Sequence, residues 1–468
     1  MLKRATYQKT LSSCFLLIVF CFFVAAHAQS GNQDTSSFSK NKNLISEGKK
    51  NSSVAPLPEC CSSIEKESDT TGEIKKFLFS GSAFMNVLLG KKLDTAGFEA
   101  GFMPVFLYRP NKHLYFLIHM HISAGAGQMH STSVSSGVAA SGHTHGTTTS
   151  SSTMTMPMSS SGAADIMLYY ANMVYYVNPY LTITGGMFPS PFGIYPERLH
   201  LPWQNHLADA PLGMGHTDQA MPLVEMGFQA SGEAAIHPVK VNYAVFISNG
   251  PSLTETGNDA GKLSYSNLLD NNKNKAIGGR IGVMPMHNSF MELGMFAQHG
   301  KAGLKTGNYS GVDALLYGAD ISIHAKVKPL KGMIDVKGQY NVVSLDKVYY
   351  KADPVLTVSS PAEDVNLADS TYRFDNITKL GFVTVSYLPV ASLSFLKNTE
   401  YILRYDRIEM PCYALWNVSK SRITAGIVYW MDTRSSVKIS YQSNILPKPI
   451  GQKQILDNMI ILQWEIGL

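Results

Sequence analysis

The residues of this chain best suited to chemistry are histidines and methionines in and around a stretch rich in Ser and Thr. Imidazole and thioether groups are soft donors that suit copper, Cu(I) in particular, and spaced pairs in a loop can wrap one ion. The pattern therefore favours a copper-binding or copper-transporting protein as one alternative. The candidate ligands are His119, His121, His130, His143, His145, Met154, Met156, Met158 and His216.

A second interpretation treats the same stretch as a low-complexity insert at a loop tip, in which the His and Met residues are incidental. No Ser, His and Asp constellation of a protease or phospholipase is recognisable, so we expect no enzymatic activity. The chain has 39 Lys and Arg against 34 Asp and Glu, a net charge of +5. So small an excess gives no argument for nucleic-acid binding.

The elements that must position these residues are β-strands with one apolar and one polar face. In residues 456–468, Leu462, Trp464 and Ile466 alternate with Gln463 and Glu465. Strict period two is typical of a strand with its two faces in different surroundings. In a membrane the apolar face must meet lipid, because a basic side chain at mid-bilayer on that face costs about 2–4 kcal/mol.

The same alternation recurs along most of the chain and predicts an all-β, antiparallel, up-and-down transmembrane barrel of sixteen strands. Links after even-numbered strands are mostly short turns, and links after odd-numbered strands are mostly long loops. That parity is typical of outer-membrane barrels. The strands are expected at 75–89, 96–109, 113–123, 164–177, 180–188, 221–233, 238–248, 275–285, 289–299, 312–327, 331–343, 372–388, 398–409, 419–431, 435–445 and 456–468.

The N-terminus carries the pattern of a secretory signal. Lys3, Arg4 and Lys9 precede an apolar stretch over 14–26, and Ala26 and Ala28 form a small-x-small cleavage site. No later apolar run is long enough for a membrane helix. We therefore expect a signal peptide over 1–28, a flexible periplasmic lead-in over 29–73 and an outer-membrane barrel over 74–468, with membrane lipids as its surroundings.

A barrel of sixteen strands is wider than its side chains can fill, so an aqueous channel is expected. The lead-in has too little apolar content to fold as a plug. The polar face of the strands would line the lumen with charges of both signs, and rings of charge set ion selectivity. The lumen candidates are Glu99, Lys240, Arg280, Asp320, Lys326, Lys337, Arg404 and Arg422.

One long-side loop, 189–220, contains the most motif-like stretch of the chain. Residues 186–195 fit the pattern Gly-x-Phe-x-x-Pro-Phe-Gly-x-Tyr, and Arg198 follows. This segment resembles the strand-to-loop segment of the Bacteroidota outer-membrane porin-like family, which is related to phosphate-selective porin O/P. The resemblance is carried by about thirty residues, and the sixteen-strand layout extends it over most of the mature chain.

The resemblance implies a monomeric or homotrimeric channel in which this loop folds inward as a constriction. It places Tyr195, Glu197, Arg198 and Trp203 at or near the narrowest section, and Asp209 belongs to the same loop. Phosphate selectivity is not expected, because the chain has no ladder of lumen arginines or lysine cluster. In a simpler interpretation, the Pro, Gly and Trp residues only stiffen the loop. The sequence thus favours passive diffusion of small hydrophilic solutes or ions, with a second loop, 124–163, carrying the His and Met residues.

Overall fold

The computed structural model describes most of the chain after residue 75. The described residues are 76–90, 96–125, 165–215, 218–265, 268, 270, 272, 274–286, 290–351, 364–366, 371–390, 394–446 and 456–468. The predicted signal peptide, the lead-in and nearly all of the His- and Met-rich loop lie outside them. Among the described residues, no helix has the length and apolar character needed to cross a bilayer.

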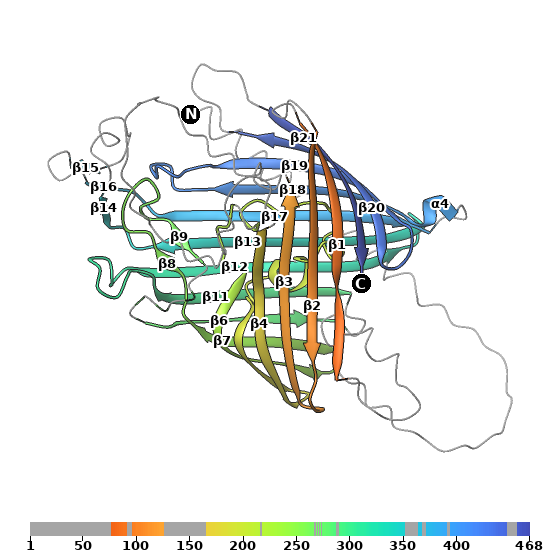
Figure 1. Cartoon of the computed structure of the whole chain (residues 1–468), viewed down its shortest axis with the longest axis horizontal. Helices are drawn as coiled ribbons and strands as arrows, with labels where there is room; N and C mark the ends of the chain where they lie inside the picture. The colour runs from red at the N-terminus through yellow and green to blue at the C-terminus, as the bar shows by residue number, and fades with distance from the viewer. Residues whose placement is uncertain are drawn as a thin grey trace.

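Sixteen antiparallel strands form one closed barrel, as the alternation predicts (Figure 1). Neighbours in sequence are neighbours in the sheet all the way round. The barrel strands are β1 (Phe77–Gly90), β2 (Gly97–Tyr108), β3 (Leu114–Gly125), β4 (Asp165–Asn178), β5 (Leu181–Pro189), β6 (Val224–Ile236), β7 (Val239–Ser248), β10 (Ala276–Met284), β11 (Met291–Lys301), β12 (Asp313–Val327), β13 (Gly332–Leu345), β17 (Ile377–Pro389), β18 (Thr399–Glu409), β19 (Lys420–Trp430), β20 (Ser435–Ile445) and β21 (Leu456–Gly467).

The last strand closes the ring against the first. β21 pairs with β1 over a register that runs from Ser82 opposite Gly467 to Gly90 opposite Met459. Its two faces separate as the sequence predicts: Trp464 is 53% exposed on the outside, whereas Glu465 is 1% exposed inside. Outward apolar residues recur on every barrel strand, which is the surface that lipid requires. The chain is therefore an outer-membrane β-barrel.

The ends of the barrel differ, and we name them by their connections. The short-turn end holds the links 109–113, 179–180, 237–238, 285–290, 328–331, 390–398 and 431–434, including the helical turn α4 (Ser394–Lys397). The long-loop end holds two small sheets, β8 (Ser252–Leu253) with β9 (Leu263–Ser264), and β14 (Tyr349–Lys351) with β16 (Thr371–Arg373) and β15 (Asp364–Asn366). Figure 1 shows these sheets at one end and α4 at the other.

The strands expected at 164–177 and 372–388 alternate poorly in sequence, and the structure explains both cases. β4 has an irregular register against β3 between His119 and Met120, so its period-two pattern is interrupted. The strand expected at 372–388 begins only at Ile377, because residues 371–373 belong to the separate small sheet. The start of β6 also moves, from 221 to Val224, since Met221 is part of the loop that precedes it.

The inner wall departs from the expected polar lining where a loop covers it. Leu316 on β12, and Leu380 and Phe382 on β17, point inward and are almost fully buried. They share an apolar cluster with Phe192 and Met214, which lie between β5 and β6. Apolar residues on this part of the inner face therefore form a core between the wall and the loop.

Candidate functional site

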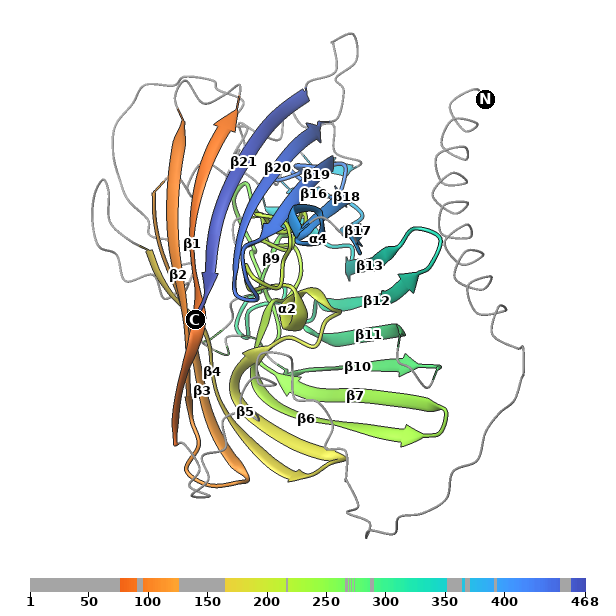
Figure 2. The ribbon, with the colours of Figure 1, turned by 90° about the vertical axis from the view of Figure 1, so that its right-hand side faces the viewer.

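The candidate site is the inside of the barrel, which the chain between β5 and β6 enters. This segment, 190–223, contains the helical turn α2 (Tyr195–Arg198), and Figure 2 shows α2 inside the ring of strands. We call 190–223 the inner loop. Its contacts reach β11, β13, β17, β18, β19 and β20, so it extends far from the two strands that anchor it.

The inner loop is held at its first bend by one amide on β13. Gln339 Oε1 accepts hydrogen bonds from the backbone N–H of Ile194 (2.9 Å) and Tyr195 (3.0 Å). Its Nε2 donates to Phe192 O at 3.0 Å. Gly193 lies between them with φ +88, and a Cβ there would come within 2.2 Å of Gln339 Cδ. The Pro-Phe-Gly part of the motif thus fits a bend wrapped closely around one side chain.

A charged cluster then ties α2 to β10, β11 and β12. Arg198 forms a bidentate pair with Glu292, at 2.6 and 3.0 Å. Arg280 bonds to Glu292 at 2.9 Å and to both oxygens of Asp320 at 2.7 and 2.9 Å. Asn242 on β7 also donates to Glu292. Two guanidinium groups face two carboxylates here, so the cluster is electrically balanced.

A second cluster fixes the middle of the inner loop to β18 and β19. Asp209 pairs with Arg404 at 2.9 Å and with Arg422 at 2.5 Å. Both arginines also bond to Asp406, and Arg422 donates to Ala210 O at 2.6 Å. Arg404 is 1% exposed and Asp406 is 0% exposed. Each guanidinium thus bridges the same two carboxylates, and charge-assisted hydrogen bonds of this kind are strong.

Between these clusters, two further contacts hold the loop: one is made by a lysine on β20, and the other is a pair between a loop histidine and a glutamate on β18. Lys438 Nζ on β20 donates to Pro202 O (2.7 Å), Asn205 O (2.8 Å) and Glu465 (2.8 Å). His206 Nδ1 lies 2.9 Å from Glu400 on β18. The cation of Lys438 is thus fully used by the loop and by its neighbour on β21, and none of its surface is left for a solute.

The predicted constriction residues do not share one environment. Tyr195 is 3% exposed and belongs to the apolar cluster. Glu197 and Trp203 are half-buried, and Arg198 has a side chain that is 40% exposed. Asp209 is enclosed by the two arginines. Arg198, Glu197 and Trp203 are therefore the members of the set that retain surface inside the barrel.

The predicted lumen residues divide in the same way. Asp320, Arg280, Arg404 and Arg422 point inward but are buried beneath the inner loop. Glu99 on β2 accepts a bond from Asn86. Lys240 and Lys337 are half-exposed and Lys326 is exposed. Gln339 is the residue that sequence reasoning missed, since an uncharged amide in an alternating strand gives no sign that it will hold a loop.

The candidate copper ligands are mostly beyond the described part of the chain, which contains only His119 and His121 of the nine. Both point into the barrel. The His119 ring lies among Tyr169, Tyr170 and His200, and the last ring stacks on Tyr169 at 3.7 Å. No group of three or more His, Cys, Asp or Glu side chains in the described residues is placed to hold a metal ion.

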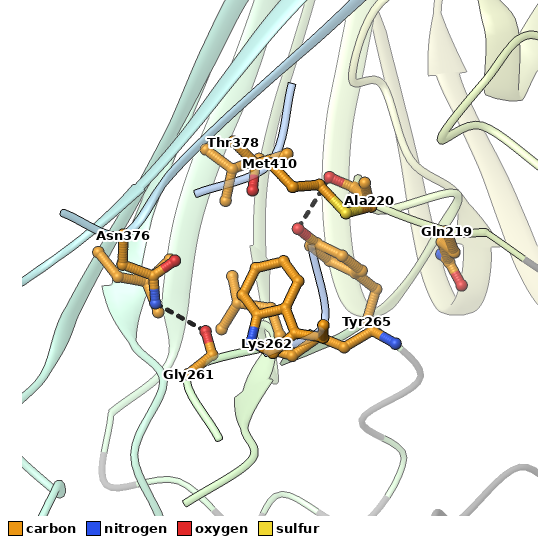
Figure 3. A pocket seen from close by; sticks show the side chains of 12 residues that line it. Gln219, Ala220, Gly261, Lys262, Tyr265, Asn376, Thr378 and Met410 are labelled. Atoms are coloured by element: carbon orange, nitrogen blue, oxygen red, sulfur yellow. Dashed lines mark hydrogen bonds between the residues drawn. The ribbon is translucent and has the colours of Figure 1, made fainter. Parts of the chain in front are cut away.

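A pocket of about 330 Å³, measured with the space at its mouth, lies where the inner loop returns toward the long-loop end. Figure 3 shows Tyr265 donating to Ala220 O, and Asn376 donating to Gly261 O, across this pocket. Trp416 Nε1 donates to Ala260 O. The first bond joins the inner loop to Tyr265, and the other two join Ala260 and Gly261 to the segments that carry Trp416 and Asn376, so the pocket is a seam between loops.

Solved structures of similar shape are bacterial outer-membrane proteins. Salmonella typhi OmpF, in complex with daunomycin, is 10% identical over 84% of this chain and 97% of its own, with a TM-score of 0.48. An anion-selective porin from Comamonas acidovorans is 9% identical over 84% and 99%, at 0.46. The channel DcaP of Acinetobacter baumannii is 12% identical over 84% and 97%, at 0.44. No family model matches the sequence, and no curated protein matches it significantly. At these values we draw no functional argument from the likeness.

Proposed function

We propose that this barrel is a porin-like channel for the passive diffusion of small hydrophilic solutes or ions. One observation carries the proposal: a loop of this length lies inside a closed sixteen-stranded barrel and is bonded to its inner wall at several separate points. A barrel of this size has more interior than its wall side chains can fill. A loop fixed inside it narrows the passage without needing a separate plug domain.

The narrow section would be bordered by the surfaces that the loop leaves accessible. Arg198 is the more exposed of the two charged side chains on α2 and pairs with Glu292, while Glu197 beside it is half-buried. Buried pairs hold the other cations of the mid-barrel wall. A constriction that presents charges of both signs favours selection by size over strong selection by charge.

The test is electrical. The purified mature protein, refolded and checked for barrel content, is added to planar bilayers, and stepwise current increases are expected. Radiolabelled or osmotic uptake into liposomes should then fall with solute size for neutral sugars. Folded protein that inserts but gives neither current steps nor sugar uptake would overturn the proposal.

Loop variants connect the current to the inner loop. Replacing Asp209 with Ala removes the carboxylate that joins Arg404 and Arg422, so the middle of the loop should loosen and the conductance should rise or become noisy. Glu409→Ala is the matched control, because this carboxylate also pairs with an arginine, Arg407, but on the exposed side of β18. Equal currents from the parent and the Asp209 variant would show that the inner loop does not control the conductance.

Two finer proposals follow from the motif over residues 186–198. We propose kinship with the Bacteroidota porin-like family, supported by the close fit of Gly193 around Gln339. We also propose that the protein can form a homotrimer. Light scattering of the detergent-solubilised protein tests the trimer, and a single protomer mass at all concentrations would exclude it.

A further inference from the structure

The short-turn end of the barrel is strongly basic. Its described residues carry basic side chains before β1 and on the links 109–113, 328–331, 390–398 and 431–434, and nearly all of those named below are exposed. Asp432 is the one acidic side chain in the described residues of these turns. The exposed basic residues at this end are Lys76, which precedes β1, and Lys112, Lys328, Lys331, Lys397 and Arg434 on the turns, whereas Arg109 is half-buried.

The inner wall next to this mouth continues the same charge. Lys240 on β7, and Lys326 and Lys337 on β12 and β13, point inward according to the strand register. Lys337 pairs with Asp335 at 2.9 Å, and Glu233 on the neighbouring strand β6 is an inward carboxylate opposite Asn242 of β7. Lys326 is exposed and Lys240 half-exposed, so both can interact with ions in the lumen.

The rest of the passage has no such excess of basic side chains. The inner loop and the mid-barrel wall hold their cations in pairs with carboxylates. At the long-loop end, cations and carboxylates also lie in contact, in the pairs Lys275 with Asp270, Lys301 with Asp313, and Lys347 with Asp375. Inside the described part of the barrel, the excess of cations over carboxylates therefore lies at the short-turn mouth, whereas Glu99, Glu197 and Glu225 add negative charge deeper in the passage.

Such an asymmetry has a direct consequence for ions. Charges of one sign around a low-dielectric opening raise the local concentration of counter-ions and exclude ions of the same sign. We propose that this channel prefers small anions, and that Lys240 and Lys326 at the short-turn mouth set the preference. This inference rests on the proposed channel function and adds the charge class of its solutes.

The preference should weaken as salt is added. The exposed lysines lie around an open mouth, where the screening length is about 10 Å at 0.1 M salt and about 3 Å at 1 M. Selectivity from a buried, narrow charge ring would survive this change, because its ions pass within contact distance. Loss of selectivity with salt therefore distinguishes the mouth from the constriction as its source.

The experiment measures reversal potentials of the mature protein in planar bilayers of phosphatidylcholine, which carries no net charge. With a KCl gradient centred near 0.1 M, the chloride permeability should exceed that of potassium roughly threefold. With a gradient centred near 1 M, the ratio should approach unity. A channel that conducts but prefers potassium at low salt overturns this inference while leaving the proposed function intact, whereas absence of current counts against the proposed function itself.

Variants identify the residues responsible. The double variant Lys240→Gln and Lys326→Gln should lose most of the preference at low salt and keep its conductance at high salt. Lys379→Gln is the matched control, because Lys379 is exposed on the outer face of β17 and should leave the ratio unchanged. An unchanged ratio in the double variant, or an equal loss in the control, overturns the assignment to the mouth.

Discussion

The mid-barrel wall and the short-turn mouth use the same residue types in opposite ways. On the mid-barrel wall, Arg404 and Lys438 are almost completely buried and bonded to the inner loop. At the mouth, Lys326 also points inward but remains exposed. Whether an inward cation stabilises the structure or faces a solute therefore depends on its position relative to the inner loop. The alternation of the strand does not distinguish the two cases.

The largest predicted effect comes from the mid-barrel wall. Arg404→Met leaves Asp406 and Asp209 buried with one guanidinium fewer, which should lower the free energy of unfolding by about 3–5 kcal/mol. The measurement is urea unfolding of the protein in liposomes, followed by tryptophan fluorescence. Arg407→Met on the same strand removes an exposed pair with Glu409 and should cost about 0–1 kcal/mol. Similar losses for both variants would contradict the distinction between buried and exposed cations.

The next effect concerns the amide that holds the first bend. Gln339→Leu leaves the N–H groups of Ile194 and Tyr195 without their acceptor, so we expect a loss of about 1–3 kcal/mol. The conductance should also become noisier, since α2 is no longer fixed to β13. Lys337→Met, two residues earlier on the same inner face, serves as the control and should leave the current trace quiet. A quiet trace from the Gln339 variant would show that other contacts suffice to hold α2.

Substitution of two glycines distinguishes the cost of side-chain crowding from the cost of backbone strain. Gly193 and Gly257 both have positive φ, +88 and +79, but a Cβ at Gly257 meets nothing within 4 Å, whereas one at Gly193 meets the Gln339 amide. Ala at either position pays the backbone cost of about 1–3 kcal/mol. Gly193→Ala should lose more than Gly257→Ala and should also alter the conductance. Equal losses in stability would mean that Gln339 moves aside freely.

The strand framework could be predicted from sequence because lipid on one side and water on the other impose a period of two. The expected strand over 435–445 matches β20 residue for residue, and the barrel of sixteen strands is confirmed. The period of two no longer predicts polar inward residues where the inner loop, instead of water, covers the wall. Phe382 and Leu380 are apolar and inward because they pack on the loop, and the path of a loop leaves no periodic pattern in the sequence.

Charge in the sequence was likewise insufficient to separate structural from solute-facing residues. Arg422 and Lys326 occupy equivalent inward positions of alternating strands, and both are equally good lumen candidates by that criterion. Arg422 differs from Lys326 in its bond to Asp406 on the neighbouring strand and in its contact with Asp209 of the inner loop, which lies some two hundred residues away in sequence. Contacts of such separation depend on the closed barrel, so they become visible only in three dimensions.

The smallest effect on stability is expected at Arg198. This residue is paired like the cations of the mid-barrel wall but partly exposed like those of the mouth. Its side chain is 40% exposed, and its partner Glu292 keeps bonds to Arg280 and Asn242 when Arg198 is removed. Since no carboxylate is left without a partner, Arg198→Met should cost only about 0–1 kcal/mol. The constriction would nevertheless gain one net negative charge, so the reversal potential should shift toward potassium at both low and high salt. A shift confined to low salt would mean that Arg198 acts on ions through a screened charge, as the lysines of the mouth do, and does not line the narrow section.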